Sequence, residues 1–217
     1  GFYALWMAEH HFQKEGYECI PNVLMLSTHL AALTKRLKFG CGFNIVPMWH
    51  PLRLAEDYAA ADILTGGRMI FGVGRGYHSR EVETFGSPVI DNDLNRELFE
   101  EQIEVILKAF NQESFSHHGK NYTIPPDVPY RGYDLKEITL VPRPINLPVE
   151  TWQPVVSGGS IEFTARNGFN GVVSLTGEKL VEQAFQRFSE ACSSNGRGDV
   201  LGSNLALGVG FYIAETQ

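Results

Sequence analysis

Residues 68–76 have the sequence Arg-Met-Ile-Phe-Gly-Val-Gly-Arg-Gly, in which a short apolar run leads directly into a glycine-rich turn. The apolar run predicts a buried β-strand. Gly72, Gly74 and Gly76 allow close approach of the backbone to a bulky anion, and Arg75 supplies a planar, permanently charged guanidinium for phosphate oxygens. The turn is therefore a candidate phosphate site, and a tight turn with a solvated arginine is the alternative interpretation.

Strands and helices alternate on both sides of this turn. Pro51 and the pair Gly66-Gly67 mark the start and the end of the helix before it, because proline suits the first turn of a helix and glycine suits its end. Repeated strand-helix units of this kind indicate a parallel sheet covered by helices. The apolar patterns predict strands over 2–8, 37–46, 69–73, 154–157, 171–174 and 205–214, and helices over 22–35, 51–65, 93–111, 160–167 and 178–193.

A long proline-rich stretch separates the first three predicted strands from the last three. Seven of the eleven prolines lie between Pro125 and Pro154, and proline is excluded from helix interiors and from central strands. Residues 113–153 are therefore predicted to form an excursion between barrel elements.

The strand-helix alternation leaves two candidate architectures, a doubly wound sheet and a (β/α)8 barrel. A complete barrel typically needs about 250 residues, whereas this chain has 217 residues and both starts and stops in a predicted strand. We therefore expect residues 1–217 to form a single α/β domain, a (β/α)8 TIM barrel truncated at both ends, without its first and last strand-helix units.

Composition excludes several classes of partner. The formal net charge is −7 and no lysine or arginine cluster is present, so a nucleic acid backbone would be repelled. Cys19, Cys41 and Cys192 are far apart, which argues against a disulfide framework or a zinc site and favours a reducing cytoplasm. Because no apolar run approaches the length of a bilayer span, we expect a cytoplasmic protein with neither a nucleic acid nor a membrane as partner.

The segment Glu9-His10-His11-Phe12 follows the first predicted strand, at the face where barrel enzymes build their active sites. Side chains alternate along a strand, so the two histidines are expected to point apart, and no metal site is predicted. A histidine at this place is instead a candidate acid, base or hydrogen-bond donor. Packing of polar strand ends against a neighbouring loop is the structural alternative.

Other strand ends carry polar or ring-bearing groups as well. Asn44 and His50 follow the second strand and His78 follows the third, although His50 also suits a helix cap and His78 a solvated loop. Trp49 is a candidate wall of a pocket. The histidine pair 117–118 precedes a predicted hairpin turn and is assigned to the surface.

A second candidate anion site lies late in the chain. Ser157-Gly158-Gly159-Ser160 precedes a short predicted helix, whose first backbone N–H groups attract negative charge. A plain helix cap is the alternative. Two anion-friendly loops favour a phosphate-bearing cofactor, and a phosphorylated substrate would satisfy the same chemistry.

Four segments in the correct order resemble those of the bacterial luciferase-like monooxygenases. They are Trp-Met-Ala-Glu-His-His-Phe at 6–12, Asn-Ile-Val-Pro-Met-Trp-His-Pro-Leu-Arg-Leu-Ala-Glu-Asp at 44–57, Leu-Thr-Gly-Gly-Arg-Met-Ile-Phe-Gly-Val-Gly-Arg-Gly-Tyr-His at 64–78 and Val-Glu-Thr-Phe-Gly at 82–86. The resemblance covers residues 2–213, is stronger in the first half, and implies a TIM barrel that binds reduced flavin at the carboxyl ends of its strands.

The resemblance also implies roles for individual residues. Arg75, with Gly74 and Gly76, looks like the family's flavin-phosphate site, His10 like its active-site histidine and His50 like a further pocket histidine. The loop of Gly158, Gly159 and Ser160 looks like a second phosphate loop, about two residues shorter than usual. Gly42, Phe43 and Asn44 match the place where the family carries a non-proline cis peptide beside the flavin, which predicts a cis bond between Gly42 and Phe43.

The implied function is oxygenation of a small organic substrate, of the aldehyde, hydrocarbon or ketone class, with reduced flavin mononucleotide (FMN) and O2. A flavin reductase is the implied supplier of reduced flavin, and a homo- or heterodimer is expected. One alternative is hydride transfer with a deazaflavin coenzyme. Another is a flavin-binding or partner subunit without catalysis, against which His10 argues.

Overall fold

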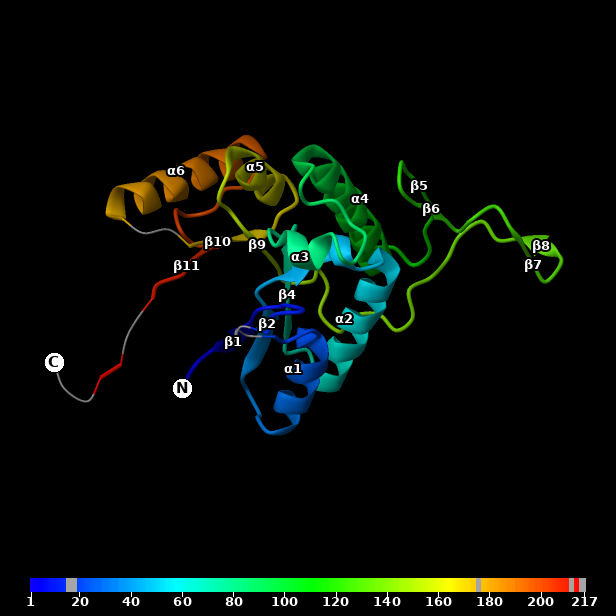
Figure 1. Ribbon diagram of the computed structural model, residues 1–217, viewed down its shortest axis with the longest axis horizontal. Coiled ribbons are helices and arrows are strands. Elements are labelled where there is room, and N and C mark those ends of the chain that lie inside the picture. The colour runs from blue at the N-terminus through cyan, green and yellow to red at the C-terminus, as the bar shows by residue number, and fades with distance from the viewer. Residues whose placement is uncertain (15–18, 175–176, 211–212, 215–217) are drawn as a thin grey trace. The chain divides into compact units, whose positions relative to one another are not determined.

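The computed structural model describes residues 1–14, 19–174, 177–210 and 213–214. The chain divides into two compact units, Gly1–Val149 and Glu150–Gln217. Each unit combines parallel strands with helices, so the predicted α/β class is confirmed for both (Figure 1). Whether they form a single domain with an excursion at 113–153 stays a prediction.

The first unit is built on a parallel sheet in which β1 pairs with β2 and β2 with β4. Leu5 lies opposite Phe39, and Phe39 lies opposite Met69. A short extra strand pairs with the end of β4, with Asn44 opposite Val73. The strands are β1 (Ala4–Met7), β2 (Lys38–Cys41), β3 (Asn44–Ile45) and β4 (Met69–Gly74).

Two long helices of the first unit begin and end within one residue of their predicted bounds, whereas the helix predicted over 22–35 ends early, at Ala32, and two short helical segments have no predicted counterpart. The second helix starts at Pro51 after the N-cap His50 and ends at Gly66, which has a left-handed φ of 70°. The second helix packs against the first and the fourth. The helical segments are α1 (Val23–Ala32), the 3-10 turn η1 (Val46–Met48), α2 (Pro51–Thr65), α3 (Ser79–Val82) and α4 (Asn92–Asn111).

Aromatic side chains fill the core between this sheet and its helices. The rings of Tyr58, Phe71 and Phe110 are centred 4.7 to 5.6 Å from one another. Phe99 and Ile103 are buried with Phe110 along one stripe of α4, as the amphipathic pattern predicts. Burial of these rings fixes β4 against α2 and α4, and with it the loop that follows β4.

The excursion carries two hairpins. β5 (His117–His118) pairs with β6 (Thr123–Ile124), and β7 (Pro129–Tyr130) pairs with β8 (Tyr133–Asp134). The predicted hairpin after the histidine pair is thus confirmed, but the surface position of His117 is wrong. This histidine is buried, because its Nε2 donates to the carboxylate of Glu101 at 3.1 Å.

Glu101 lies on α4 at the same spacing as the exposed residues Glu97 and Glu104, but it is not solvated. Its side chain is only 10 % exposed. The carboxylate accepts hydrogen bonds from the backbone N–H groups of Asn121 and Tyr122 at 2.9 Å and from the side chain of Asn121. A helix glutamate therefore holds the turn of the β5–β6 hairpin, a pairing that no local pattern reveals.

The second unit repeats the strand-helix arrangement. β10 pairs in parallel with β9 and β11, with Gly171 opposite both Gln153 and Leu205. The two helices of the unit pack against each other over a core that contains Ile161, Val173 and Phe188. The elements are β9 (Thr151–Pro154), α5 (Gly158–Arg166), β10 (Asn170–Val173), α6 (Glu178–Ser194) and β11 (Leu205–Leu207).

Four predicted strands differ from the structure. The strand predicted over 37–46 is interrupted between Cys41 and Asn44 and forms the separate strands β2 and β3. β9 ends at Pro154 instead of beginning there, because the polar side chains of Thr151 and Gln153 are buried and hide the apolar pattern.

β11 ends at Leu207, and not at residue 214, because Gly208 and Gly210 follow Leu207. Residues 211–212 of the predicted strand lie outside the described part of the chain. β1 spans Ala4–Met7, within its predicted range of 2–8, and its side chains are half-buried or exposed.

None of the helices in the described residues combines the length and the apolar character that a bilayer span requires.

Candidate active site

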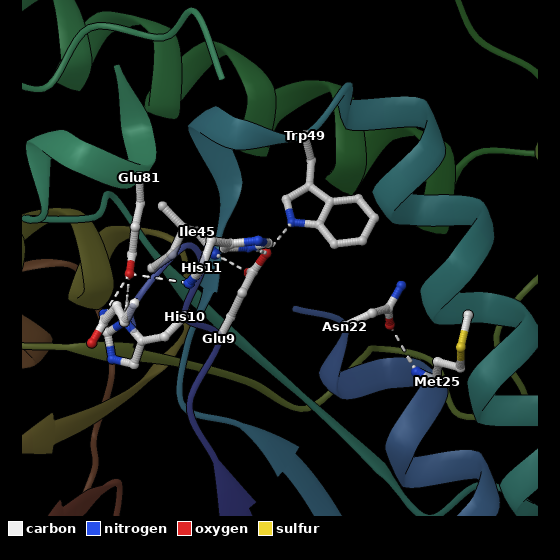
Figure 2. A network of polar contacts seen from close by, with 9 residues as sticks. Glu9, His10, His11, Asn22, Met25, Ile45, Trp49 and Glu81 are labelled. Atoms are coloured by element: carbon white, nitrogen blue, oxygen red, sulfur yellow. Dashed lines mark hydrogen bonds and ion pairs between the residues drawn. The ribbon is translucent and has the colours of Figure 1, made fainter. Parts of the chain in front are cut away.

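The first unit brings His10 together with a carboxylate far away in sequence. His10 follows β1, and Glu81 lies on α3, just after the glycine turn of β4. The Nδ1 atom of His10 lies 3.1 Å from Oε1 of Glu81 (Figure 2). The same carboxylate accepts hydrogen bonds from the backbone N–H of His11 at 3.1 Å and from the side-chain amide of Gln13 at 2.7 Å.

This carboxylate fixes the proton arrangement of His10. An ionised carboxylate only accepts, so Nδ1 of His10 carries the proton of their hydrogen bond and Nε2 is left for another partner. Burial raises the pKa of Glu81, but hydrogen bonds from Gln13, His11 and His10 outweigh it, and the pKa lies below its ordinary value. Glu81 therefore stays ionised beside His10 at neutral pH.

A second buried carboxylate, Glu9, orders the neighbouring backbone. It accepts hydrogen bonds from the backbone N–H of Ile45 at 2.7 Å and from the indole N–H of Trp49 at 2.9 Å. Nε2 of His11 donates to it at 3.1 Å (Figure 2). Glu9 thus ties the end of β1 to β3 and to η1, which holds His10 in place between two anchored neighbours.

The rings of His10 and His11 point apart, as the strand alternation predicts. His10 is directed to Glu81 and His11 to Glu9, so the adjacent imidazoles serve different carboxylates. Among the described residues, no group of three or more His, Cys, Asp or Glu side chains is gathered closely enough to hold a metal ion.

Aromatic rings from the loop after β4 lie over His10. The ring of His78 is centred 5.4 Å and that of Tyr77 6.3 Å from the imidazole of His10. His78 is also the N-cap residue of α3, the helix that carries Glu81. The predicted strand-end histidine at position 78 is therefore a neighbour of His10 and not an isolated loop residue.

Arg75 lies in the same loop, directly after β4. Its guanidinium donates to the backbone and side-chain oxygens of Asn92, at 3.4 and 3.1 Å. No carboxylate forms an ion pair with Arg75 within the described residues. Burial lowers the pKa of Arg75, Arg96 lowers it further and Glu100 opposes both, but a guanidinium stays charged. Arg75 and Arg96 are therefore neighbouring cations, and Arg75 has no carboxylate partner within the described residues. This combination favours the binding of an anion at the loop.

The glycines of the turn serve the protein's own backbone as well as any ligand. A Cβ at position 72 would lie 1.8 Å from the carbonyl oxygen of Cys41, and one at position 74 would lie 3.2 Å from Phe43. Gly76 has a φ of 80°, which favours glycine. Close packing of β4 on the end of β2 and the segment after it therefore requires Gly72 and favours Gly74. The sequence interpretation explains both glycines by the approach of an anion instead.

The peptide bond between Gly42 and Phe43 is cis, which confirms that prediction. Phe43 packs near Trp6, with ring centres 6.4 Å apart. The side-chain amide of Asn44, which is buried, donates to the carbonyl oxygen of Gly72 at 2.8 Å. Asn44 thus joins this segment to β4, and a direct role of Gly42, Phe43 and Asn44 in cofactor binding stays a prediction.

His50 is a helix cap, the alternative that its place before Pro51 left open. Its Nδ1 accepts a hydrogen bond from the backbone N–H of Leu52 at 3.3 Å, and its ring packs edge-on against Tyr122 at 5.4 Å. These contacts are separate from the His10–Glu81 pair. A catalytic role for His50 stays a prediction.

In the second unit, the loop before α5 forms a capping box. The Ser157 hydroxyl accepts from the N–H of Ser160 at 3.2 Å, and the Ser160 hydroxyl accepts from the N–H of Ser157 at 2.9 Å. The helix begins at Gly158, two residues before the predicted start. Because the cap occupies Ser160, an anion at this end would meet the N–H groups of Gly158 and Gly159.

Glu9, Glu81 and Glu101 are the functional or supporting residues that sequence reasoning missed. Glu9 carries a local signal, since it directly follows an apolar strand and a residue at that place is expected to be at least partly buried. Glu81 has a weaker local signal, which is its position one helical turn after His78. Glu101 has none, because it repeats at the same spacing as truly exposed glutamates of α4.

Glu81→Gln is expected to destabilise the protein by about 1–3 kcal/mol at neutral pH, because it weakens hydrogen bonds to a buried charge. The folded pKa of Glu81 is lowered, so its contribution is present above the unfolded pKa of about 4.3 and is lost as pH falls through the folded value. Urea unfolding at several pH values checks this: wild type should lose more stability on acidification than Glu81→Gln, and the exposed Glu113→Gln should follow wild type.

Parallel strands with helices, and polar side chains at the carboxyl ends of those strands, define an α/β protein with a barrel-type active face. The family model described as luciferase-like monooxygenase matches residues 1–217. The chain belongs to the luciferase-like monooxygenase family.

Known proteins similar to this chain include both enzymes and enzyme components. The oxygenase component of a flavin-dependent trigonelline monooxygenase from Acinetobacter baylyi is 29 % identical over 195 residues, which cover 88 % of this chain and 50 % of the relative. More generally, the chain spans between 34 and 53 % of the length of the first curated relatives that it matches.

Solved structures share the fold. The oxygenating constituent of 3,6-diketocamphane monooxygenase from Pseudomonas putida, in complex with FMN, matches with a TM-score of 0.76 and 22 % identity over 95 % of this chain and 56 % of that chain. An F420-dependent secondary alcohol dehydrogenase matches with a TM-score of 0.77 and 15 % identity over 95 % of this chain and 59 % of that chain.

Proposed function

We propose that this protein is a flavin-dependent monooxygenase that uses reduced FMN and O2 to oxygenate a small organic substrate of the aldehyde, ketone or hydrocarbon class. The observation that carries the proposal is the His10–Glu81 pair, a histidine held 3.1 Å from a buried carboxylate at the carboxyl end of β1. Membership of the luciferase-like monooxygenase family supports the same activity.

The residues of the first unit fit a flavin phosphate. Arg75 is charged, donates to the neutral oxygens of Asn92 and, within the described residues, to no carboxylate, and lies beside Arg96. A phosphate dianion at this loop would relieve the repulsion between the two guanidinium groups and gain charge-assisted hydrogen bonds. We assign the FMN phosphate to Arg75, and the glycine N–H groups at 158 and 159 remain a predicted second contact.

When bound, reduced flavin supplies the electrons that activate O2. The chain's own contribution is to hold and move one proton. Glu81 fixes the proton of His10 on Nδ1, which leaves Nε2 of His10 as the atom that takes up or delivers a proton at the reacting group. Glu9 anchors the backbone on both sides of this histidine through Ile45 and Trp49.

Two other functions compete with this proposal. Similarity to an F420-dependent dehydrogenase keeps hydride transfer with a deazaflavin as a candidate. A partner subunit that binds flavin without turnover is disfavoured, because such a subunit has no need of a histidine ordered by a buried carboxylate.

A relative named as the oxygenase component of a monooxygenase favours a separate flavin reductase as the partner that supplies reduced FMN. A homo- or heterodimer remains part of the proposal.

The proposal is tested by supplying the purified protein with FMN, NADH and a flavin reductase under 18O2, and by measuring mass spectra of products from an aldehyde, a ketone and a hydrocarbon. We expect a product that carries one 18O atom. Turnover that requires reduced deazaflavin and proceeds without O2 would assign the protein to the dehydrogenase branch instead, and FMN binding without any product would assign it to the partner subunits.

A further inference from the structure

The amide of Gln102 has a defined orientation. Gln102 lies on α4 and is only 1 % exposed. Its Nε2 donates to the carbonyl oxygen of Trp49 at 2.8 Å and to the hydroxyl oxygen of Tyr122 at 2.9 Å. Because a carbonyl oxygen only accepts, the nitrogen end of the amide must face Trp49, and the reverse orientation is excluded.

This orientation makes the hydroxyl of Tyr122 an acceptor toward Gln102 and leaves its own proton for another partner. Within the described residues, that proton has no acceptor. Burial raises the pKa of Tyr122, the hydrogen bond from Gln102 lowers it and the charge of Glu101 raises it again; because the pKa lies above its ordinary value, the phenol stays protonated at neutral pH. Tyr122 is thus a fixed donor.

His50, whose ring packs against Tyr122, is also a hydrogen-bond donor, because one of its ring nitrogens already accepts a hydrogen bond. The backbone N–H of Leu52 donates to Nδ1 of His50, so neutral His50 carries its proton on Nε2. Partial burial lowers the pKa of His50, with Glu56 opposing, which favours this neutral form. The rings of His50 and Tyr122 are centred 5.4 Å apart and nearly perpendicular, at 86°.

Three contacts fix this donor pair and link it to the segment that bears His10. Glu101 binds the backbone N–H of Tyr122 at 2.9 Å and so fixes the hairpin that carries it. Trp49 precedes His50, accepts from Gln102 through its carbonyl and donates through its indole to Glu9, the residue before His10. The pair is therefore linked through the hydrogen bonds of Trp49 to the segment that bears His10.

We propose that Tyr122 and His50 form a two-donor subsite that recognises an acceptor oxygen, of carbonyl or carboxylate type, on the substrate. The inference rests on the proposed function and narrows its substrate class. A carbonyl oxygen offers lone pairs to both donors, whereas a plain hydrocarbon would leave two polar groups without partners, a cost that discriminates against it. Tyr122 is then a specificity-determining residue supplied by the excursion.

The experiment compares acetophenone with α-methylstyrene, which has the same shape but carries a CH2 group in place of the carbonyl oxygen. Calorimetric titrations of the purified protein are made without reduced flavin or NADH, so that no turnover occurs. We expect wild type to bind acetophenone about tenfold more tightly, as two modest hydrogen bonds predict. Tyr122→Phe, which keeps the ring, is expected to lower this ratio about threefold or more.

Tyr130→Phe is the matched control, because Tyr130 lies on the other hairpin, β7–β8, and packs against Tyr133. It should keep the wild-type ratio. Equal affinities of wild type for the two probes, no binding of either, or an unchanged ratio in Tyr122→Phe would overturn the subsite. Failure of the proposed function would appear differently, as absence of an 18O product while the ratio of affinities is intact.

A second measurement needs no ligand. The 15N chemical shifts of the His50 ring report which nitrogen carries the proton, and we expect the Nε2-protonated form. A proton on Nδ1 would remove His50 from the donor pair and refute the two-donor subsite.

Discussion

His10→Ala is expected to leave FMN binding nearly intact and to lower turnover by about 100-fold or more, the loss typical of a positioned proton-transfer group. The reason lies in the bond between Nδ1 of His10 and Glu81, at 3.1 Å, which orders the imidazole for one proton transfer. Fluorescence titration of FMN and single-turnover product formation measure the two effects separately.

His118→Ala is the control for this experiment, because His118 is exposed on the β5–β6 hairpin and should behave as wild type. Unchanged turnover in His10→Ala would move His10 to a packing role. If turnover and FMN affinity fell together, His10 would be part of the flavin contact instead.

Arg75→Ala is expected to weaken FMN binding by about 1.5–3 kcal/mol, between roughly ten- and 150-fold, while riboflavin binding changes little. The lost interaction is a charge-assisted contact to phosphate, which riboflavin does not have. Arg75 is available for that contact because it donates to the neutral oxygens of Asn92 and not to a carboxylate, within the described residues. Titrations of both ligands with both proteins check the difference.

Arg53→Ala provides a control for the loss of one positive charge, since Arg53 lies exposed on α2 and pairs with Glu56 and Asp57. Its FMN affinity should match that of wild type. An equal loss of FMN and riboflavin binding in Arg75→Ala would show that Arg75 supports the fold or the flavin ring and not the phosphate.

Local patterns in the sequence predict most of the elements, because their causes are local. Pro51 and Gly66 bound α2, and the spacing of Phe99, Ile103 and Phe110 fixes the buried stripe of α4. Where burial runs against local chemistry, the prediction fails. The polar residues Thr151 and Gln153 lie inside the second unit, so the apolar pattern places β9 three residues too late.

The features of the candidate site also fall into those that the sequence predicts and those that it does not. The sequence by itself determines which histidine and which arginine stand at strand ends, and the resemblance to a known family adds the cis bond between Gly42 and Phe43. It also determines that Gly76 suits a turn with positive φ. These statements depend on residues within a few positions of one another.

Only the tertiary structure decides which partner each of these groups has. Glu81 meets His10 across 71 residues of chain, and Glu9 meets Trp49 across 40. Glu101 resembles its exposed neighbours on α4, yet it alone accepts the N–H of Tyr122, 21 residues away. A carboxylate's charge and hydrogen-bonding capacity are the same wherever it stands in the sequence, and its role is set by the donors that packing brings within about 3 Å of it.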